Sequence, residues 1–312
     1  MKISVLGGAG MMGQGIVRDL LSERAIVPLS EVRICDSSRP RMEALRAALG
    51  DDRIRLVDLD VADPAALDAA LQGADLCIND RDAEGAAATA REVAALGRRC
   101  VAVPGDMGDP AAIDALMAAF DRAYERPDIL INNVGIGHRT RPEVLEFADW
   151  RKVMAVNLDG TFLCTREVGR RMIAAGRGGS IVNISSIAGS SALGRGNFVY
   201  SVSKGAIIQF TRELAIEWAP HRIRVNAIQP AQILTPALQA MFADPRLDPQ
   251  SLHERLVRGI PLDRLGQPED IARAATFLVS DGASFITGLI MPVDGGNMAL
   301  NAGGSKVWPT GG

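Results

Sequence analysis

Two residues one helical turn apart carry the strongest chemical signal in the sequence. In the stretch 200-YSVSK-204, Tyr200 and Lys204 are spaced i and i+4, so on a helix they lie on one face. An ammonium group beside a phenol favours the phenolate and lowers a pKa that is ordinarily about 10. The spacing therefore predicts that Tyr200 serves as a general acid and base near neutral pH. The alternative is a surface pair that shares this spacing by chance.

Hydroxyl and amide side chains at the ends of other segments would complete such a site. Ser186 follows the apolar run 181–184 at the carboxyl end of an expected strand, where sites of α/β proteins lie, and there it could hydrogen-bond a substrate oxygen. Asn133 ends another strand-like run, and Asn157 lies in 156-VNLDGTF-162. Taken singly, these residues also fit a solvated loop serine, an Asx turn and a helix-interior amide.

Glycines near the N-terminus predict nucleotide binding. They follow an expected strand and open a helix in the pattern GxGxxG, formed by Gly8, Gly10 and Gly13. This pattern allows a tight turn and close approach to a pyrophosphate at a helix N-terminus. Asp36 follows Gly13 by 23 residues, at the end of the next expected strand, where it could hold ribose hydroxyls. Arg39 and Arg41 could instead meet a 2′-phosphate, so the cofactor is expected to be NAD, with NADP left open.

The elements that must position these residues alternate regularly. Short β-rich runs alternate with helices rich in Ala, Leu and Arg, which predicts an α/β fold with a doubly wound, Rossmann-like parallel sheet. The expected strands cover residues 2–6, 32–35, 54–58, 75–79, 100–104, 129–133, 180–184, 223–228 and 289–293. Nine strands exceed the needs of one such sheet, so we expect extra N-terminal βα units.

An internal repeat accounts for the extra units. Residues 60-DVADPAALDAAL-71 echo 106-DMGDPAAIDALM-117, and 74-ADLCIND-80 echo 127-PDILINN-133. The run 74–80 thus lies at a junction: it is either the second strand of the downstream unit or the fourth strand of the upstream one. We expect three parts: a nucleotide-binding segment 1–73, a catalytic core 74–300 and a C-terminal tail 301–312.

Charge and composition disfavour several classes of protein. The 312 residues include 34 Lys+Arg and 37 Asp+Glu, a net charge of −3 that gives no indication of nucleic-acid binding. No apolar run approaches the roughly 18 residues of a membrane helix, and the N-terminus does not resemble a signal peptide. The cysteines form no CxxC pair and fit free thiols in a reducing compartment: Cys35, Cys77, Cys100 and Cys164. We expect a cytoplasmic protein with no metal site and no membrane partner.

Between about residues 74 and 297, the chain resembles the short-chain dehydrogenase/reductase family. The resemblance rests on the ordered motifs DMGD, NNVG, VNLDGTF, GGSIVNISSIAG, YSVSK and RVNAIQP. It implies an NAD(P)-dependent enzyme that interconverts an alcohol and a carbonyl, with a small-molecule alcohol or ketone as substrate. It also implies a homodimer or homotetramer with helices around 161–175 and 199–217 at the interface; burial in the core would equally explain their apolar residues.

The resemblance further implies roles for individual residues. Tyr200 would exchange a proton with the substrate oxygen and Ser186 would polarise it, while hydride passes to or from the nicotinamide. Lys204 would lower the pKa of Tyr200 and hold the nicotinamide ribose, and Asn157 would position a water. Cofactor contacts are implied for Asp80, Asp106, Met107, Asn133, Gly135 and Thr235. An acid at position 80 favours NAD, and Arg81 beside it weakens that preference.

Residues 1–80 resemble instead the cofactor domain of saccharopine and lysine dehydrogenase-like proteins, through MKISVLGGAGMMGQGIVRDLL and DVADPAALDAALQGADLCIN. The short-chain pattern begins with a TGxxxGxG turn that leads directly into the strand matched by 74–80, whereas here 67 residues separate Gly13 from Asp80. Three hypotheses follow: a short-chain oxidoreductase, a non-catalytic nucleotide-binding protein whose cofactor site the junction disrupts, and a saccharopine-type dehydrogenase. The last is disfavoured because its substrate domain has no counterpart here.

Overall fold

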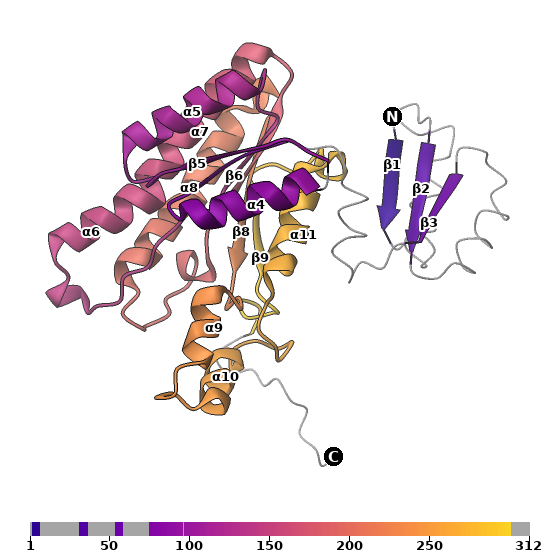
Figure 1. Ribbon diagram of the computed structural model, residues 1–312. Coiled ribbons are helices and arrows are strands. Elements are labelled where there is room, and N and C mark those ends of the chain that lie inside the picture. The colour runs from indigo at the N-terminus through magenta and orange to yellow at the C-terminus, as the bar shows by residue number, and fades with distance from the viewer. Residues whose placement is uncertain (1, 7–30, 37–53, 59–74, 96, 301–312) are drawn as a thin grey trace. The chain divides into compact units, whose positions relative to one another are not determined.

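The chain divides into two compact units, Met1–Asp75 and Leu76–Gly312. The computed structural model describes residues 2–6, 31–36, 54–58, 75–95 and 97–300 (Figure 1). The predicted glycine turn of Gly8, Gly10 and Gly13 and the tail 301–312 lie outside these residues, so their predicted roles stay predictions.

The first unit contains a parallel three-stranded sheet. Strands β1 (Lys2–Leu6), β2 (Glu31–Asp36) and β3 (Ile54–Asp58) lie in the order β1-β2-β3. Asp36 is the last residue of β2 and is in register with Asp58 of β3. The predicted acid therefore lies at a strand end, as its spacing from the glycine turn indicates.

In the residues that the structure describes, the second unit contains six parallel strands in two sheets. Strand β4 (Leu76–Asp80) pairs with β5 (Cys100–Pro104). The other sheet has the order β6-β7-β8-β9, formed by β6 (Ile129–Asn132), β7 (Gly179–Ile184), β8 (Ile223–Pro230) and β9 (Ile290–Val293). All nine expected strands are present, and the predicted α/β class with parallel pairing is confirmed.

Several of the described helices begin at a capping residue followed by a proline. In the described residues the helices are α4 (Ala83–Ala95), α5 (Pro110–Ala123), α6 (Phe147–Met154), α7 (Gly160–Ala175), α8 (Phe198–Glu217), α9 (Pro236–Phe242), α10 (Pro249–Val257) and α11 (Pro268–Val279). Helix α5 illustrates the start signal: Asp109 caps it by accepting a hydrogen bond from the Ala111 N–H, and Pro110 occupies the first turn.

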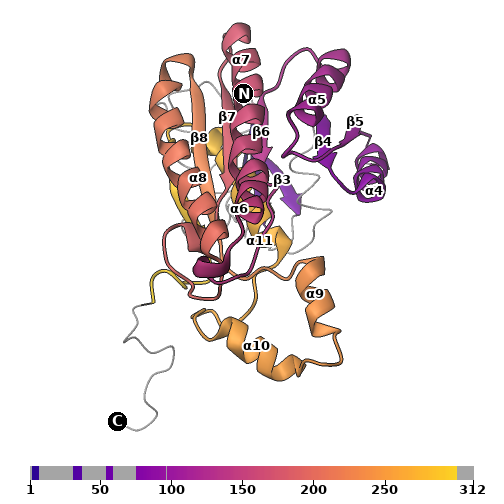
Figure 2. The same ribbon diagram turned by 90° about the vertical axis from the view of Figure 1, so that its left-hand side faces the viewer.

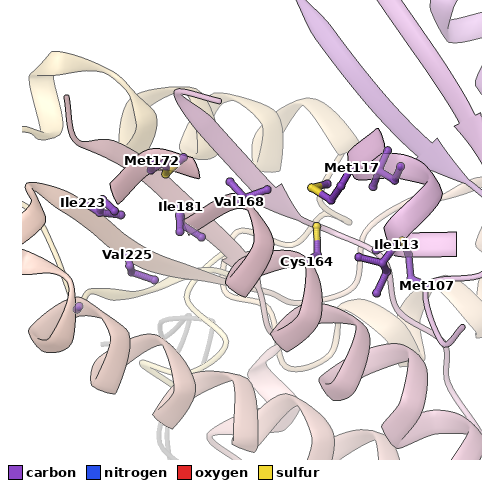
Figure 3. Packing of buried hydrophobic residues seen from close by; sticks show 11 residues of the cluster. Met107, Ile113, Met117, Cys164, Val168, Met172, Ile181, Ile223 and Val225 are labelled. Atoms are coloured by element: carbon purple, nitrogen blue, oxygen red, sulfur yellow. The ribbon is translucent and has the colours of Figure 1, made fainter. Parts of the chain in front are cut away.

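One hydrophobic core connects both sheets of the second unit. Helices α5 and α7 contribute Ile113, Met117, Val168 and Met172, which pack with Ile181 and Val225 of β7 and β8 (Figure 3). Cys77, Val103 and Leu130, from β4, β5 and β6, pack against the same cluster. Helix α11 covers the opposite face of β7 and β8 through Ala275 and Leu278 (Figure 2). The shared core therefore holds the β4–β5 pair against the larger sheet.

The cysteines of the second unit are free thiols, as predicted. Cys77, Cys100 and Cys164 form no disulfide, and burial raises the pKa of Cys77 and of Cys164 to about 11. Thiols with a pKa this high are poor nucleophiles and serve as packing groups.

Gly160, the first residue of α7, allows that helix to approach the loop after β5. A β-carbon at Gly160 would overlap the backbone oxygen of Met107. We predict that Gly160→Ala lowers the free energy of unfolding by about 1–2 kcal/mol, because this overlap outweighs the helix preference of alanine. Urea denaturation measures it. Gly137→Ala is the control, since nothing lies within 4 Å of its added β-carbon; equal effects of the two changes would contradict the prediction.

Candidate active site

The four predicted catalytic residues come from three elements of the second unit. Asn157 lies in the π-helical turn Ala155–Asp159 between α6 and α7. Ser186 follows β7, and Tyr200 and Lys204 lie on α8. The structure brings them together: Ser186 hydrogen-bonds to Tyr200 through their side chains, and the Lys204 Nζ lies 5.8 Å from the centre of the Tyr200 ring.

The loop after β6 passes directly beside this group. A β-carbon at Gly135 would lie 3.1 Å from the Lys204 Nζ and 3.5 Å from the Asn157 Oδ1. The predicted residue Gly135 therefore lies beside Lys204 and Asn157, and a larger residue there would press against the Lys204 side chain. Asn133, two residues earlier, is exposed.

Asn157 is fully buried, and all of its side-chain hydrogen-bonding groups contact the protein. Its Oδ1 accepts from the Ile136 N–H at 2.8 Å, and its Nδ2 donates to the Ile136 carbonyl at 3.0 Å and to the Ser203 Oγ at 2.9 Å. These bonds connect the π-helical turn to the loop after β6 and to α8. Irregular helical turns of this kind are frequent at functional sites.

Ser186 is held at its backbone and at its side chain. The Gln229 Nε2, on β8, donates to the Ser186 carbonyl at 2.9 Å and to the Ser190 Oγ at 2.8 Å. The Ser186 Oγ accepts from the Ala188 N–H at 3.1 Å and caps the short helix Ile187–Gly189. The hydroxyl that faces Tyr200 is therefore fixed in position by residues of β8 and of the following turn.

The prediction that Tyr200 has a lowered pKa is wrong for this structure. Burial raises the pKa of Tyr200, and the side-chain hydrogen bond with Ser186 only partly offsets this effect. The reason is that burial removes the phenolate from water. The Lys204 ammonium donates at 2.7 Å to the carbonyl of Ile184, the last residue of β7.

Lys204 is buried, with 4% of its surface exposed, and burial lowers its pKa to about 8. An ammonium group has three donors, and the bond to Ile184 uses one of them. The remaining donors and a pKa close to neutral suit this lysine both to hold hydroxyl groups and to take part in proton exchange.

The predicted cofactor contacts lie at several strand ends of the second unit. Asp80 ends β4 and accepts from the Asp82 N–H, while Asp106 follows β5 and accepts from the Gly108 N–H. Thr235 caps α9 by accepting from the Leu238 N–H. The side chain of Met107 is buried in the hydrophobic core, so this residue can offer a ligand only its backbone.

A buried polar network beneath the site was missed by the sequence analysis. The Asn132 Nδ2 donates to the Thr165 Oγ1 and to the Asn183 Oδ1, both at 2.8 Å, and the Asn183 Nδ2 donates to the Thr211 Oγ1 at 2.9 Å. It ties β6 and β7 to α7 and α8. The available signal was a polar residue inside two apolar strand runs, 129-ILIN-132 and 181-IVNI-184. Polar networks of this kind specify one arrangement of the elements that they connect.

Comparison with known proteins identifies the families. Residues 61–297 match the family described as enoyl-(acyl carrier protein) reductase, and residues 3–101 match the saccharopine dehydrogenase NADP binding domain. The chain is 41% identical over 230 residues to galactitol 2-dehydrogenase (L-tagatose-forming) of Cereibacter sphaeroides, covering 73% of this chain and 86% of that protein. It is 40% identical over 198 residues to the NAD-dependent glycerol dehydrogenase of Listeria innocua, covering 64% and 75%.

A solved structure supports the same assignment. The gluconate 5-dehydrogenase from Burkholderia cenocepacia, in complex with NADP and tartrate, matches with a TM-score of 0.66 at 27% identity and with 96% of each chain covered. The chain belongs to the short-chain dehydrogenase/reductase family. It is accordingly an oxidoreductase that interconverts an alcohol and a carbonyl with NAD or NADP. The predicted resemblance of the N-terminal residues to saccharopine dehydrogenases is also confirmed.

None of the helices in the described part of the chain is long and apolar enough to cross a membrane.

The lowered pKa of Lys204 predicts a pH-dependent contribution to stability. Burying the ammonium opposes folding below the folded pKa of about 8, and this penalty disappears as the pH rises towards the ordinary value of 10.5. The difference in free energy of unfolding, Lys204→Met minus wild type, should therefore fall by about 3 kcal/mol from about pH 7 to about pH 10.5. Urea unfolding across this range measures it. A difference that does not change with pH would contradict the lowered pKa.

Proposed function

We propose that this enzyme oxidises a small polyhydroxy alcohol, or reduces the corresponding ketone, with Tyr200 as the group that exchanges the proton. The observation that carries the proposal is the hydrogen bond between the side chains of Ser186 and Tyr200, with Lys204 one helical turn further along α8. The choice of substrate class rests on relatives named for galactitol and glycerol. The bound nicotinamide would accept or donate the hydride.

Each of the four residues has a proposed task in this reaction. In the direction of oxidation, the Tyr200 phenol passes its own proton to the relay of Lys204 and a water and takes the proton of the substrate hydroxyl as the hydride leaves the same carbon; in reduction these transfers run in reverse. Ser186 donates a hydrogen bond to the substrate oxygen. Lys204 holds the nicotinamide ribose with the donors that Ile184 does not use. Asn157 positions the loop after β6 and a water of the proton relay.

The residues of the second unit fit a dinucleotide. The glycine at position 135 leaves room for a ligand beside the Lys204 ammonium, where a β-carbon would lie at 3.1 Å. Asp80 and Asp106 place carboxylates at the ends of β4 and β5, where they can accept hydrogen bonds from ribose and adenosine donors. We propose NAD as the preferred cofactor, because the Asp80 carboxylate would repel a 2′-phosphate. Asn133, Met107 and Thr235 are proposed as further contacts.

We also propose tasks for the parts of the chain. Residues 1–73 form a nucleotide-binding segment, with Gly8, Gly10, Gly13 and Asp36 as its contacts, residues 74–300 form the catalytic core, and residues 301–312 form a tail. The free thiols of the second unit support a cytoplasmic location.

The decisive variant is Tyr200→Phe. We predict that it lowers turnover of a polyol such as galactitol or glycerol with NAD⁺ by roughly 10²–10⁴-fold, because it removes the general acid and base, while NADH affinity stays unchanged. NADH absorbance follows turnover, and fluorescence titration follows binding. Tyr124→Phe is the matched control: it changes the only other tyrosine, whose hydroxyl donates to the Leu76 carbonyl, and should leave turnover unchanged.

Other outcomes would favour the rival hypotheses. Wild-type protein that binds NADH but turns over no alcohol, with Tyr200→Phe indistinguishable from it, would show a non-catalytic nucleotide-binding protein. NADH formation that depends on lysine or saccharopine would show an amino-acid dehydrogenase.

A homodimer or homotetramer through α7 and α8 is the proposed assembly. These helices carry large apolar side chains that remain exposed, among them Phe162 on α7 and Ile216 on α8, with 46% and 75% of their surfaces exposed. We predict that Ile216→Glu lowers the molar mass in light scattering towards that of one chain. Val144→Glu, which changes an exposed residue outside these helices, should leave the mass unchanged. A monomeric wild type would contradict the assembly.

A further inference from the structure

A cavity of about 200 Å³ lies where the chain leaves β4 and where it leaves β6. Arg81, the residue after β4, forms one side. The other sides come from the loop after β6 and from α6: Ile136, Gly137, His138, Asp149 and Lys152. All of these residues belong to the second unit, so the cavity is a feature of that unit alone.

Positive charge dominates the lining of this cavity. Arg81 and Lys152 are exposed and form no ion pair with any residue in the described part of the chain. The one acid, Asp149, already faces His138, with the His138 Nε2 and the Asp149 Oδ2 3.6 Å apart. Two cations that pair with no acid of the described residues therefore border a small cavity, and an anion of matching size is the complementary ligand.

The cavity lies between the two ends of the proposed cofactor site. At one end, Arg81 directly follows Asp80, the proposed ribose acid. At the other end, Ile136 is bonded to Asn157 through both its N–H and its carbonyl, and Gly135 lies beside Lys204. A dinucleotide that reaches from Asp80 to Lys204 must cross the space between them with its pyrophosphate.

The strand arrangement makes this crossing point a binding crevice. From β4 the chain continues to its partner β5, and from β6 it continues to its partner β7. In the residues that the structure describes, no strand pairs with β4 on its other side or with β6 on its other side. The connections that follow β4 and β6 thus lead to different strands. Ligands of open α/β sheets bind in the crevice that forms where neighbouring connections separate in this way. There, backbone N–H groups of a glycine turn ordinarily hold the phosphates.

We propose that side-chain cations of the second unit hold the pyrophosphate of the cofactor in this cavity: Arg81 as a bidentate donor and Lys152 as a point charge, with His138 as a further donor. This inference rests on the proposed function, since it concerns the same cofactor. It assigns to Arg81 a contact with the pyrophosphate shared by NAD and NADP, not with the 2′-phosphate found only in NADP. Guanidinium groups match phosphate geometry through two parallel hydrogen bonds.

The test is a fluorescence titration of the full-length protein with NADH and with NADPH. Arg81→Gln and Lys152→Gln should each weaken binding of both nucleotides roughly tenfold, the range expected for a charge-assisted hydrogen bond. Arg151→Gln is the matched control, because Arg151 precedes Lys152 on α6, is exposed and does not line the cavity; it should bind as the wild type does. Since all three residues are exposed, their replacement should leave the thermal unfolding midpoint unchanged.

A second comparison isolates the phosphates from the rest of the cofactor. Wild-type protein should bind ADP more tightly than adenosine, and the Arg81→Gln/Lys152→Gln double variant should lose this preference. A loss confined to NADPH would overturn the inference in favour of a 2′-phosphate contact. Unchanged affinity for both nucleotides, or an equal loss in Arg151→Gln, would also overturn it. None of these results depends on turnover, so the role of Tyr200 is tested separately.

Discussion

The bond from the buried Lys204 ammonium to the Ile184 carbonyl is the contact on which the candidate site depends. Ile184 ends β7, so this bond fixes α8 against the end of an interior strand of the larger sheet. A second bond acts at the same place, because the Ser185 Oγ donates to the Lys204 carbonyl at 2.8 Å. Burying an ammonium opposes folding, as its pKa of about 8 shows. The packing of α8 through Ile207, Ile208 and Ala215 must therefore outweigh that cost.

Burial acts on both members of the Tyr200–Lys204 pair in the same physical way. It disfavours the charged form of each group, which raises the pKa of the phenol and lowers that of the amine. The hydrogen bond with Ser186 favours the phenolate and partly offsets the effect of burial on the Tyr200 pKa. The backbone of Ser186 is in turn fixed by Gln229, a buried residue of a different strand.

In the second unit, one hydrophobic cluster packs against both parts of a divided sheet. The cluster around Met117, Val168 and Ile181 packs against residues of β4, β5 and β6 alike, although the β4–β5 pair and the four-stranded sheet are not hydrogen-bonded to each other in the described residues. The space at the ends of β4 and β6 is bordered by Arg81 and Lys152. Both family matches include β4, which agrees with its place in an internal repeat. In this chain, side-chain cations therefore line a cavity at the place where a glycine turn ordinarily holds the phosphates of a nucleotide.

The sequence by itself determined every strand and the composition of the candidate site, because both follow from local patterns. An apolar run predicts a strand without reference to distant residues, and the four-residue spacing of Tyr200 and Lys204 places them on one face of any helix.

The sequence could not decide the partner of β4, since 74–80 and 127–133 echo each other and either unit could accept the strand. The pairing of Leu76 with Cys100 is seen only in the tertiary structure. Nor could it supply the direction of the Tyr200 pKa, which depends on burial by residues distant in the chain. Only the tertiary structure decided these points, because pairing and burial arise where segments remote in sequence meet.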